Sequence, residues 1–190
     1  MTRLNLGCGR NILPGWLNLD AAALPGVDIV ADLDACARQP LPLSADSVEE
    51  MLLSHVLEHM RNPLPLMQEL WRVAKPGCRM VVRAPYGSSD DAFEDPTHVR
   101  QLFPQSFGYF SQPFYWLADY GYRGDWKTER ITLLVAKEGN DGLPVQEIMH
   151  KVMTLRNVVR EMIAELVCIK PARAPKRELQ MAPAINVQLI

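Results

Sequence analysis

Features that mark several large classes of protein are missing from this sequence. The four cysteines stand at positions 8, 36, 78 and 168 and form no C-x-x-C pair, so neither a zinc ribbon nor a redox couple is indicated. Reduced thiols of a cytoplasmic protein are expected. No apolar run approaches the roughly 18 residues of a membrane span, and the first residues lack a signal-peptide pattern. Lys plus Arg number 20 against 22 Asp plus Glu, so we expect neither a nucleic-acid partner nor a membrane.

What remains is the composition of a globular protein. The chain has 190 residues, 48% hydrophobic and 22% charged, which allows one domain, or one domain with an appendage. Over the first 137 residues short apolar runs alternate with helical or loop-like stretches. This alternation predicts an α/β fold, a doubly wound parallel sheet covered by helices. Strands are expected at 2–6, 16–19, 28–31, 48–54 and 79–84, and one helix from Pro63 until Lys75-Pro76-Gly77.

Aromatic residues are scarce and gather in one segment. The chain has only five Phe, five Tyr and four Trp, and ten of these lie between Phe103 and Trp126. One interpretation is a β-hairpin and helix packed on the edge of the sheet. The other is an aromatic wall over a binding cleft, and both can hold at once.

The character of the chain changes after Lys137, where residues 138–142 form a turn-rich break. Apolar residues then recur every three or four positions, which predicts one amphipathic helix over 144–167. We therefore divide the chain into a domain at 1–137 and a helical extension with a tail at 138–190. The apolar stripe would meet either its own sheet or a second copy in a homodimer. Near the end, Ile185, Val187 and Leu189 alternate with polar residues, which indicates a closing edge strand.

The first expected strand runs into a glycine turn. Leu6-Gly7-Cys8-Gly9 follows it directly, and two glycines let a ligand approach main-chain N–H groups. Asp20 ends the second expected strand, where a carboxylate can accept both hydroxyls of a ribose. Asp32, followed by Leu33, lies just past the third and can accept from an adenine amino group. Together these residues predict a nucleoside site at the carboxyl edge of the sheet.

The spacing distinguishes between nucleoside ligands. Dinucleotide sites need a third glycine and an acid about 20 residues further on, but Ile12 takes the place of that glycine and Asp20 follows Gly9 by 11 positions. Only six residues, including Pro14, separate Gly9 from Trp16. We expect a loop or a single turn there, without the helix that would face a pyrophosphate. The pattern disfavours NAD and suits S-adenosylmethionine.

With these motifs the sequence resembles the class I S-adenosylmethionine-dependent methyltransferases, in particular the small type-11-like branch, over about residues 2–137. Leu57-Glu58-His59 and Lys75-Pro76-Gly77 match further family motifs, whereas Cys78 replaces the usual second glycine. The resemblance implies a Rossmann-like sheet in the order 3-2-1-4-5-7-6 with its last strand antiparallel. It implies S-adenosyl-L-methionine as the cofactor, bound by Leu6, Gly7, Cys8, Gly9, Asp20, Asp32, Leu33 and His55.

Histidines raise two further hypotheses. In this fold His98 lies in a segment over the acceptor pocket, where it is our candidate for a catalytic base, or else a histidine that hydrogen-bonds a loop. His55 and His59 satisfy the H-x-x-E-H zinc pattern. Zinc needs both on one helical face, yet His55 ends a strand pattern and Pro63 and Pro65 restrict any helix there. We therefore expect no metal.

The function implied is methyl transfer from S-adenosylmethionine to a small-molecule or saccharide-like acceptor. An alternative is a catalytically silent S-adenosylmethionine-binding subunit that acts as a scaffold or partner. An NAD-dependent reductase is not indicated, because the spacing of the glycines and of Asp20 does not match a dinucleotide site.

Overall fold

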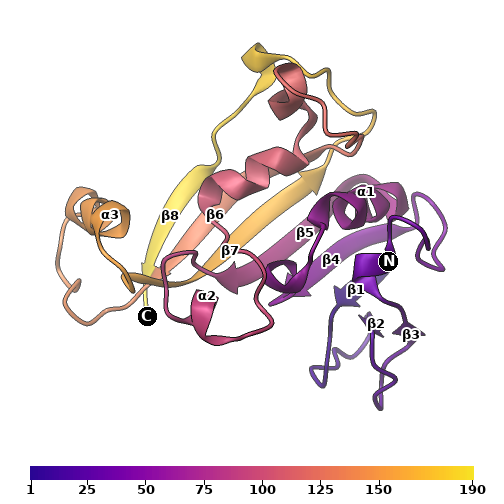
Figure 1. The fold of residues 1–190 in the computed structure, drawn as a ribbon, viewed down its shortest axis with the longest axis horizontal. Helices are drawn as coiled ribbons and strands as arrows, with labels where there is room; N and C mark the ends of the chain where they lie inside the picture. Colours follow the sequence, from indigo (N-terminus) through magenta and orange to yellow (C-terminus); the bar gives the residue numbers. More distant parts are fainter.

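The computed structural model describes residues 1–190, and its centre is one mixed sheet (Figure 1). The eight strands follow the order β3-β2-β1-β4-β5-β7-β6-β8. They are β1 (Arg3–Leu6), β2 (Leu17–Asp20), β3 (Ile29–Val30), β4 (Val48–Ser54), β5 (Ala74–Pro85), β6 (Trp126–Val135), β7 (Val159–Cys168) and β8 (Ala184–Leu189). The α-helices are α1 (Pro63–Val73), α2 (Asp91–Glu94) and α3 (Val145–Thr154). The 3₁₀ helices are η1 (Leu33–Ala35), η2 (Leu57–His59), η3 (Pro104–Phe110), η4 (Gln112–Trp116) and η5 (Arg177–Leu179).

The sheet confirms the expected Rossmann-like order. β1 pairs in parallel with β2 and β4, β4 pairs in parallel with β5, and β7 runs antiparallel to both β5 and β6. β8 then extends the sheet beside β6 and parallel to it, as the alternating residues near the C-terminus predicted. The carboxyl ends of the parallel strands therefore share one edge, where this fold binds its ligands.

The expected helix over 144–167 is wrong. α3 ends at Thr154, the chain turns through Asn157 at φ 59°, and β7 begins at Val159. Met162, Ala164 and Leu166 are buried and alternate with half-buried neighbours, which is the period of a strand. Apolar residues at 159, 162 and 166 suit a helical period as well, and the unpaired edges of β5 and β6 decide between the two.

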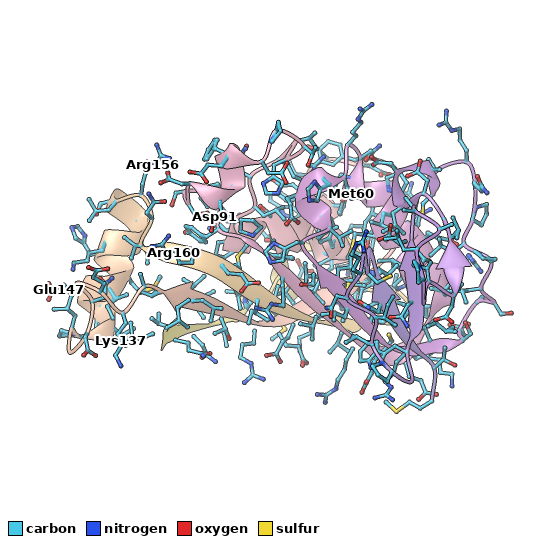
Figure 2. All side chains as sticks on the ribbon, turned by 90° about the horizontal axis from the view of Figure 1, so that it is seen from below. Met60, Asp91, Lys137, Glu147, Arg156 and Arg160 are labelled. Atoms are coloured by element: carbon cyan, nitrogen blue, oxygen red, sulfur yellow. The ribbon has the colours of Figure 1, made fainter.

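The same strand corrects the domain division and decides where the expected apolar stripe packs. Because β7 lies between β5 and β6, residues beyond 137 supply an inner strand of the sheet that begins at Arg3. A boundary at 137 therefore separates no structural unit. Val159, Met162 and Leu166 are at most 1% exposed, so the stripe expected to meet a second copy is buried within its own chain. α3, with Glu147, lies at the end of the molecule away from β1–β3 (Figure 2).

Helical segments cover the sheet unevenly. α1 packs on β5, and η3 packs on β6 and β7. The fully buried indole of Trp126 joins the two regions, because its Nε1 donates to the Met67 carbonyl of α1 at 3.0 Å. The aromatic segment contains no hairpin; it forms η3 and η4. No helix combines the length and apolarity that a bilayer crossing would need.

Two buried asparagines replace a helix between β1 and β2. As predicted, the connection contains no helix. Asn5 and Asn18 are 1% and 3% exposed, and Asn5 Nδ2 donates to Asn18 Oδ1 at 2.9 Å. The Asn5 amide also donates to the Asn11 carbonyl, and the Asn18 amide donates to the Leu13 and Trp16 carbonyls. Leu13 N–H donates to Asn18 Oδ1 in return. These bonds satisfy a loop backbone that would otherwise need a helix to pair its polar groups.

A chain that ends at Lys137 should not fold cooperatively, because β5 and β6 would lose the strand between them. A chain that ends at Gln180 loses only the edge strand β8, whose residues are exposed or half-buried, and should still melt in a single transition. Circular dichroism during thermal unfolding compares the two. A cooperative transition in the shorter chain would contradict the role of β7.

Asn18→Ala should lower the free energy of unfolding by about 1–3 kcal/mol, because it leaves buried groups of the crossover without partners. Asn186→Ala removes an exposed asparagine from β8 and serves as the matched control, with little expected change. Urea titration of both variants measures the difference.

Candidate active site

The predicted cofactor residues meet at the carboxyl edge of the sheet. Leu6 is in register with Leu19, and Asp20 is in register with Val30, so the glycine turn and Asp20 end side by side. Asp32 lies two residues past the end of β3 and caps η1, where its Oδ1 accepts from Asp34 N–H at 2.9 Å. The glycine turn, Asp20 and Asp32 therefore all lie at the carboxyl edge of the sheet.

The glycine turn requires its two glycines for different reasons. Gly7 has φ 59°, and a Cβ there would lie 2.6 Å from Val56 Cγ2. Gly9 has φ 51°, and no atom lies within 4 Å of its missing Cβ. Gly7 is therefore needed for packing against the segment after β4, whereas Gly9 leaves open space in front of the main chain.

Asp20 provides the acceptors that a ribose needs. Its Oδ2 accepts from Gly9 N–H at 2.7 Å and its Oδ1 accepts from Ala22 N–H at 2.9 Å, so each oxygen keeps a lone pair. Val30, its neighbour in register, is 57% exposed and offers an apolar surface beside the carboxylate. Open backbone, two free acceptors and an exposed apolar side chain fit the nucleoside of S-adenosylmethionine.

Other predicted cofactor residues can contribute only main-chain atoms. Leu6, Cys8 and Leu33 are at most 6% exposed, so their side chains face the core. We expect them to shape the site through their N–H and carbonyl groups.

His55 stands at the end of β4 with φ 56°. Its Nε2 lies 3.2 Å from Glu161 Oε1, and its Nδ1 lies 3.2 Å from Glu58 Oε1. The hydrogen bond with Glu161, then that with Glu58, raises the pKa of His55 to about 9. Arg83 holds Glu161 through two bonds of 2.8 and 2.7 Å. Both ring nitrogens are engaged, so any contact with the cofactor would involve the ring face.

Arg83 and Glu161 were missed from the sequence. Glu161 belongs to β7, which the residue pattern presented as part of a helix. Only the pairing of β7 with β5 brings it beside Arg83 and His55.

His98 does not face the aromatic cavity. Its side chain is 7% exposed and its ring meets that of His59 edge to face, with 4.7 Å between centroids. A general base must contact the proton that it removes, and this position gives that role no support.

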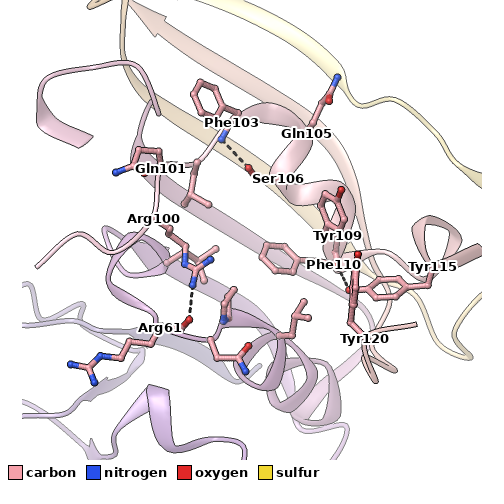
Figure 3. Close-up of a pocket in the computed structure, with 15 residues that line it drawn as sticks. Arg61, Arg100, Gln101, Phe103, Gln105, Ser106, Tyr109, Phe110, Tyr115 and Tyr120 are labelled. Carbon is pink, nitrogen blue, oxygen red and sulfur yellow. Dashed lines mark hydrogen bonds between the residues drawn. The ribbon is translucent and has the colours of Figure 1, made fainter. Parts of the chain in front are cut away.

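An aromatic cavity of about 710 Å³ lies beside the N-terminus of α1 (Figure 3). The sequence left two interpretations of the aromatic segment, and each holds in part. Phe107, Tyr122 and Trp126 belong to the core. The aromatic residues that line the cavity are Phe103, Tyr109, Phe110, Tyr115 and Tyr120.

A second cavity, of about 700 Å³, links the two sides of the site. It is lined by Asp32 and His59, and Arg61 and Asn62 belong to the walls of both cavities. Asp32, predicted to contact adenine, and the aromatic cavity thus lie on either side of one segment after η2.

Residues 4–82 match the model of the type-11 family described as a methyltransferase domain. This range therefore carries a methyltransferase domain, and the solved structures that share its fold include S-adenosylmethionine-dependent methyltransferases. This matched range holds the glycine turn, Asp20, Asp32 and η2. S-adenosylmethionine is accordingly its cofactor, and its activity is methyl transfer.

Solved structures share the fold of this methyltransferase. An S-adenosylmethionine-dependent methyltransferase from Archaeoglobus fulgidus matches with a TM-score of 0.61 and 17% identity, over 87% of this chain and 86% of the other. One from Aquifex aeolicus matches with a TM-score of 0.53 and 14% identity, over 89% and 82%. The [4+2]-cyclase SpnF matches with a TM-score of 0.51 and 13% identity, over 88% and 74%. No curated protein sequence matches.

Asp20→Ala should weaken binding of S-adenosylhomocysteine by about 1.5–3 kcal/mol, because hydrogen bonds to a charged group are lost. Asp20→Asn keeps an oxygen for Gly9 N–H and should lose less. Isothermal calorimetry measures both, with the exposed turn residue Asp141→Ala as control. An unchanged affinity of Asp20→Ala for S-adenosylhomocysteine would show that Asp20 does not bind the ribose.

Proposed function

We propose that this methyltransferase acts on a small-molecule or saccharide-like acceptor held in the aromatic cavity. The observation that carries the proposal is the cavity itself, because its volume of about 710 Å³ falls within the range of small-molecule sites, about 300–1,000 Å³. A nucleic-acid acceptor would call for a basic protein, and the formal net charge is −2.

The chemistry of the wall supports such an acceptor. Tyr109 and Tyr120 are 53% and 63% exposed, and aromatic faces pack well on the C–H faces of sugars and on other rings. Arg61, Gln101 and Gln105 add polar groups to the same wall. These side chains can fix the orientation of a polar, ring-shaped molecule.

The bound cofactor supplies an electrophilic methyl group on a sulfonium. The chain contributes by holding the ribose on Asp20 and the acceptor against the aromatic wall, and the segment from Arg61 to Asn62 relates the two positions. Orientation of two reactants can provide a large share of the rate enhancement. With His98 turned inward, we assign catalysis to this positioning and to no base.

We also propose a cytoplasmic location, supported by four buried cysteines that are all unpaired. A silent scaffold subunit, the alternative raised from the sequence, would bind S-adenosylhomocysteine equally well. Turnover therefore decides between the two. Release of S-adenosylhomocysteine with a panel of glycosides, phenols and amines is the measurement, and failure with every class would favour the scaffold.

Tyr109→Ala should raise the KM for the acceptor by about twofold to tenfold, the range for one aromatic contact, without changing the affinity for S-adenosylhomocysteine. Phe93→Ala removes an equally exposed aromatic from α2, outside the cavity, and is the matched control. Equal effects of both variants on the KM would show that the acceptor does not bind in this cavity.

A further inference from the structure

A cluster of three side chains remains unused by the proposed methyl transfer. Glu58, His59 and His98 each offer one donor atom, and these atoms lie within 4.8 Å of one another. From this geometry we propose that the three side chains bind one divalent transition-metal ion of the zinc type. The proposal does not depend on the identity of the methyl acceptor.

Glu58 is only half satisfied for a buried carboxylate. It is 2% exposed, and the His55 ring contacts its Oε1 at 3.2 Å. Its Oε2 has no hydrogen-bond partner within the chain. A buried carboxylate in this state is costly unless a cation or a proton joins it.

His59 is oriented with one ring nitrogen free. Thr97 Oγ1 donates to Asp95 Oδ1 at 2.6 Å, so its lone pairs face His59 Nδ1 at 3.0 Å. Nδ1 of His59 must then carry the proton, and Nε2 keeps its lone pair. Metal-bound histidines commonly have their second nitrogen tied in this way.

His98 lies near the same aspartate. Its Nε2 is 3.8 Å from Asp95 Oδ2, whereas its Nδ1 is buried and has no partner. Asp95 therefore lies next to both rings, hydrogen-bonded to His59 through Thr97 and close to His98. The remaining nitrogens are available as ligands.

Backbone contacts hold the two halves of the cluster together. Val99 N–H donates to the Glu58 carbonyl at 2.9 Å. Arg100 donates to the Met60 and Arg61 carbonyls at 2.8 and 2.7 Å, the latter visible in Figure 3. The segment that carries His98 is thus fixed on the one that carries Glu58 and His59, as a preformed site requires.

The donor set indicates the class of ion. Two neutral imidazoles and one carboxylate suit zinc and neighbouring first-row ions, and do not suit calcium or magnesium, which prefer oxygen ligands. Three protein ligands leave a coordination position open. His59 also lines the cavity of about 700 Å³, from which water or another ligand could enter.

This arrangement revises the expectation of no metal. The H-x-x-E-H pattern pairs His59 with His55, but His55 has φ 56° and both its nitrogens face carboxylates. The partner of His59 is His98, which only the tertiary structure brings near.

The full chain, stripped with a chelator, would be titrated with Zn²⁺ by calorimetry and with Co²⁺ by visible absorption. We expect about one equivalent of each ion, a rise in the melting temperature with Zn²⁺, and d–d bands for Co²⁺. Absence of binding at 100 µM Zn²⁺ (roughly the weak end of a specific site) would overturn the proposal.

Variants locate the ion. His59→Asn, on a partly exposed ring, and His98→Asn should each weaken Zn²⁺ binding by more than about 100-fold, and Asp95→Asn by about 10–100-fold. His150→Asn removes the remaining histidine, exposed on α3, and should change nothing. Zn²⁺ affinity unchanged in both His59→Asn and His98→Asn would refute the site. Binding of S-adenosylhomocysteine by these variants shows that they are folded.

Discussion

The insertion of β7 between β5 and β6 is the constraint on which the rest of the molecule depends. Without it the parallel strands from β1 to β5 would end in an unpaired edge, and β6 and β8 would have no connection to them. The same strand carries Glu161 to Arg83 and His55. An element near the C-terminus therefore completes the sheet and shapes the edge where the cofactor residues gather.

Buried polar groups stabilise the short crossover between β1 and β2, which contains no helix. Asn5 and Asn18 satisfy the short crossover, so the glycine turn and Asp20 keep their places without a covering helix. Glu58 differs from them, because one oxygen of its buried carboxylate has no partner although His59 and His98 lie nearby. Native proteins seldom leave a buried polar atom without a partner, and a bound metal ion would supply one to Glu58.

The segment from η2 to the start of α1 contributes to both cavities and to the proposed metal site. Glu58 and His59 belong to the proposed metal site, and Arg61 and Asn62 line both cavities. Arg100 fixes this segment through main-chain carbonyls. Cofactor, acceptor and ion would therefore be placed relative to one another by one short, well-tied stretch of chain.

The sequence by itself predicted which residues gather at the carboxyl edge of the sheet. Leu6-Gly7-Cys8-Gly9 and Asp20 end strands and Asp32 follows the third, and parallel strands bring their carboxyl ends to one edge, so local patterns sufficed for this prediction. The tertiary structure alone decided the fate of 159–168, because its apolar spacing suits a helix and a strand alike and only the open edges of β5 and β6 select the strand. It also decided the place of His98, which meets Glu58 and His59 through contacts between distant segments that no local spacing encodes.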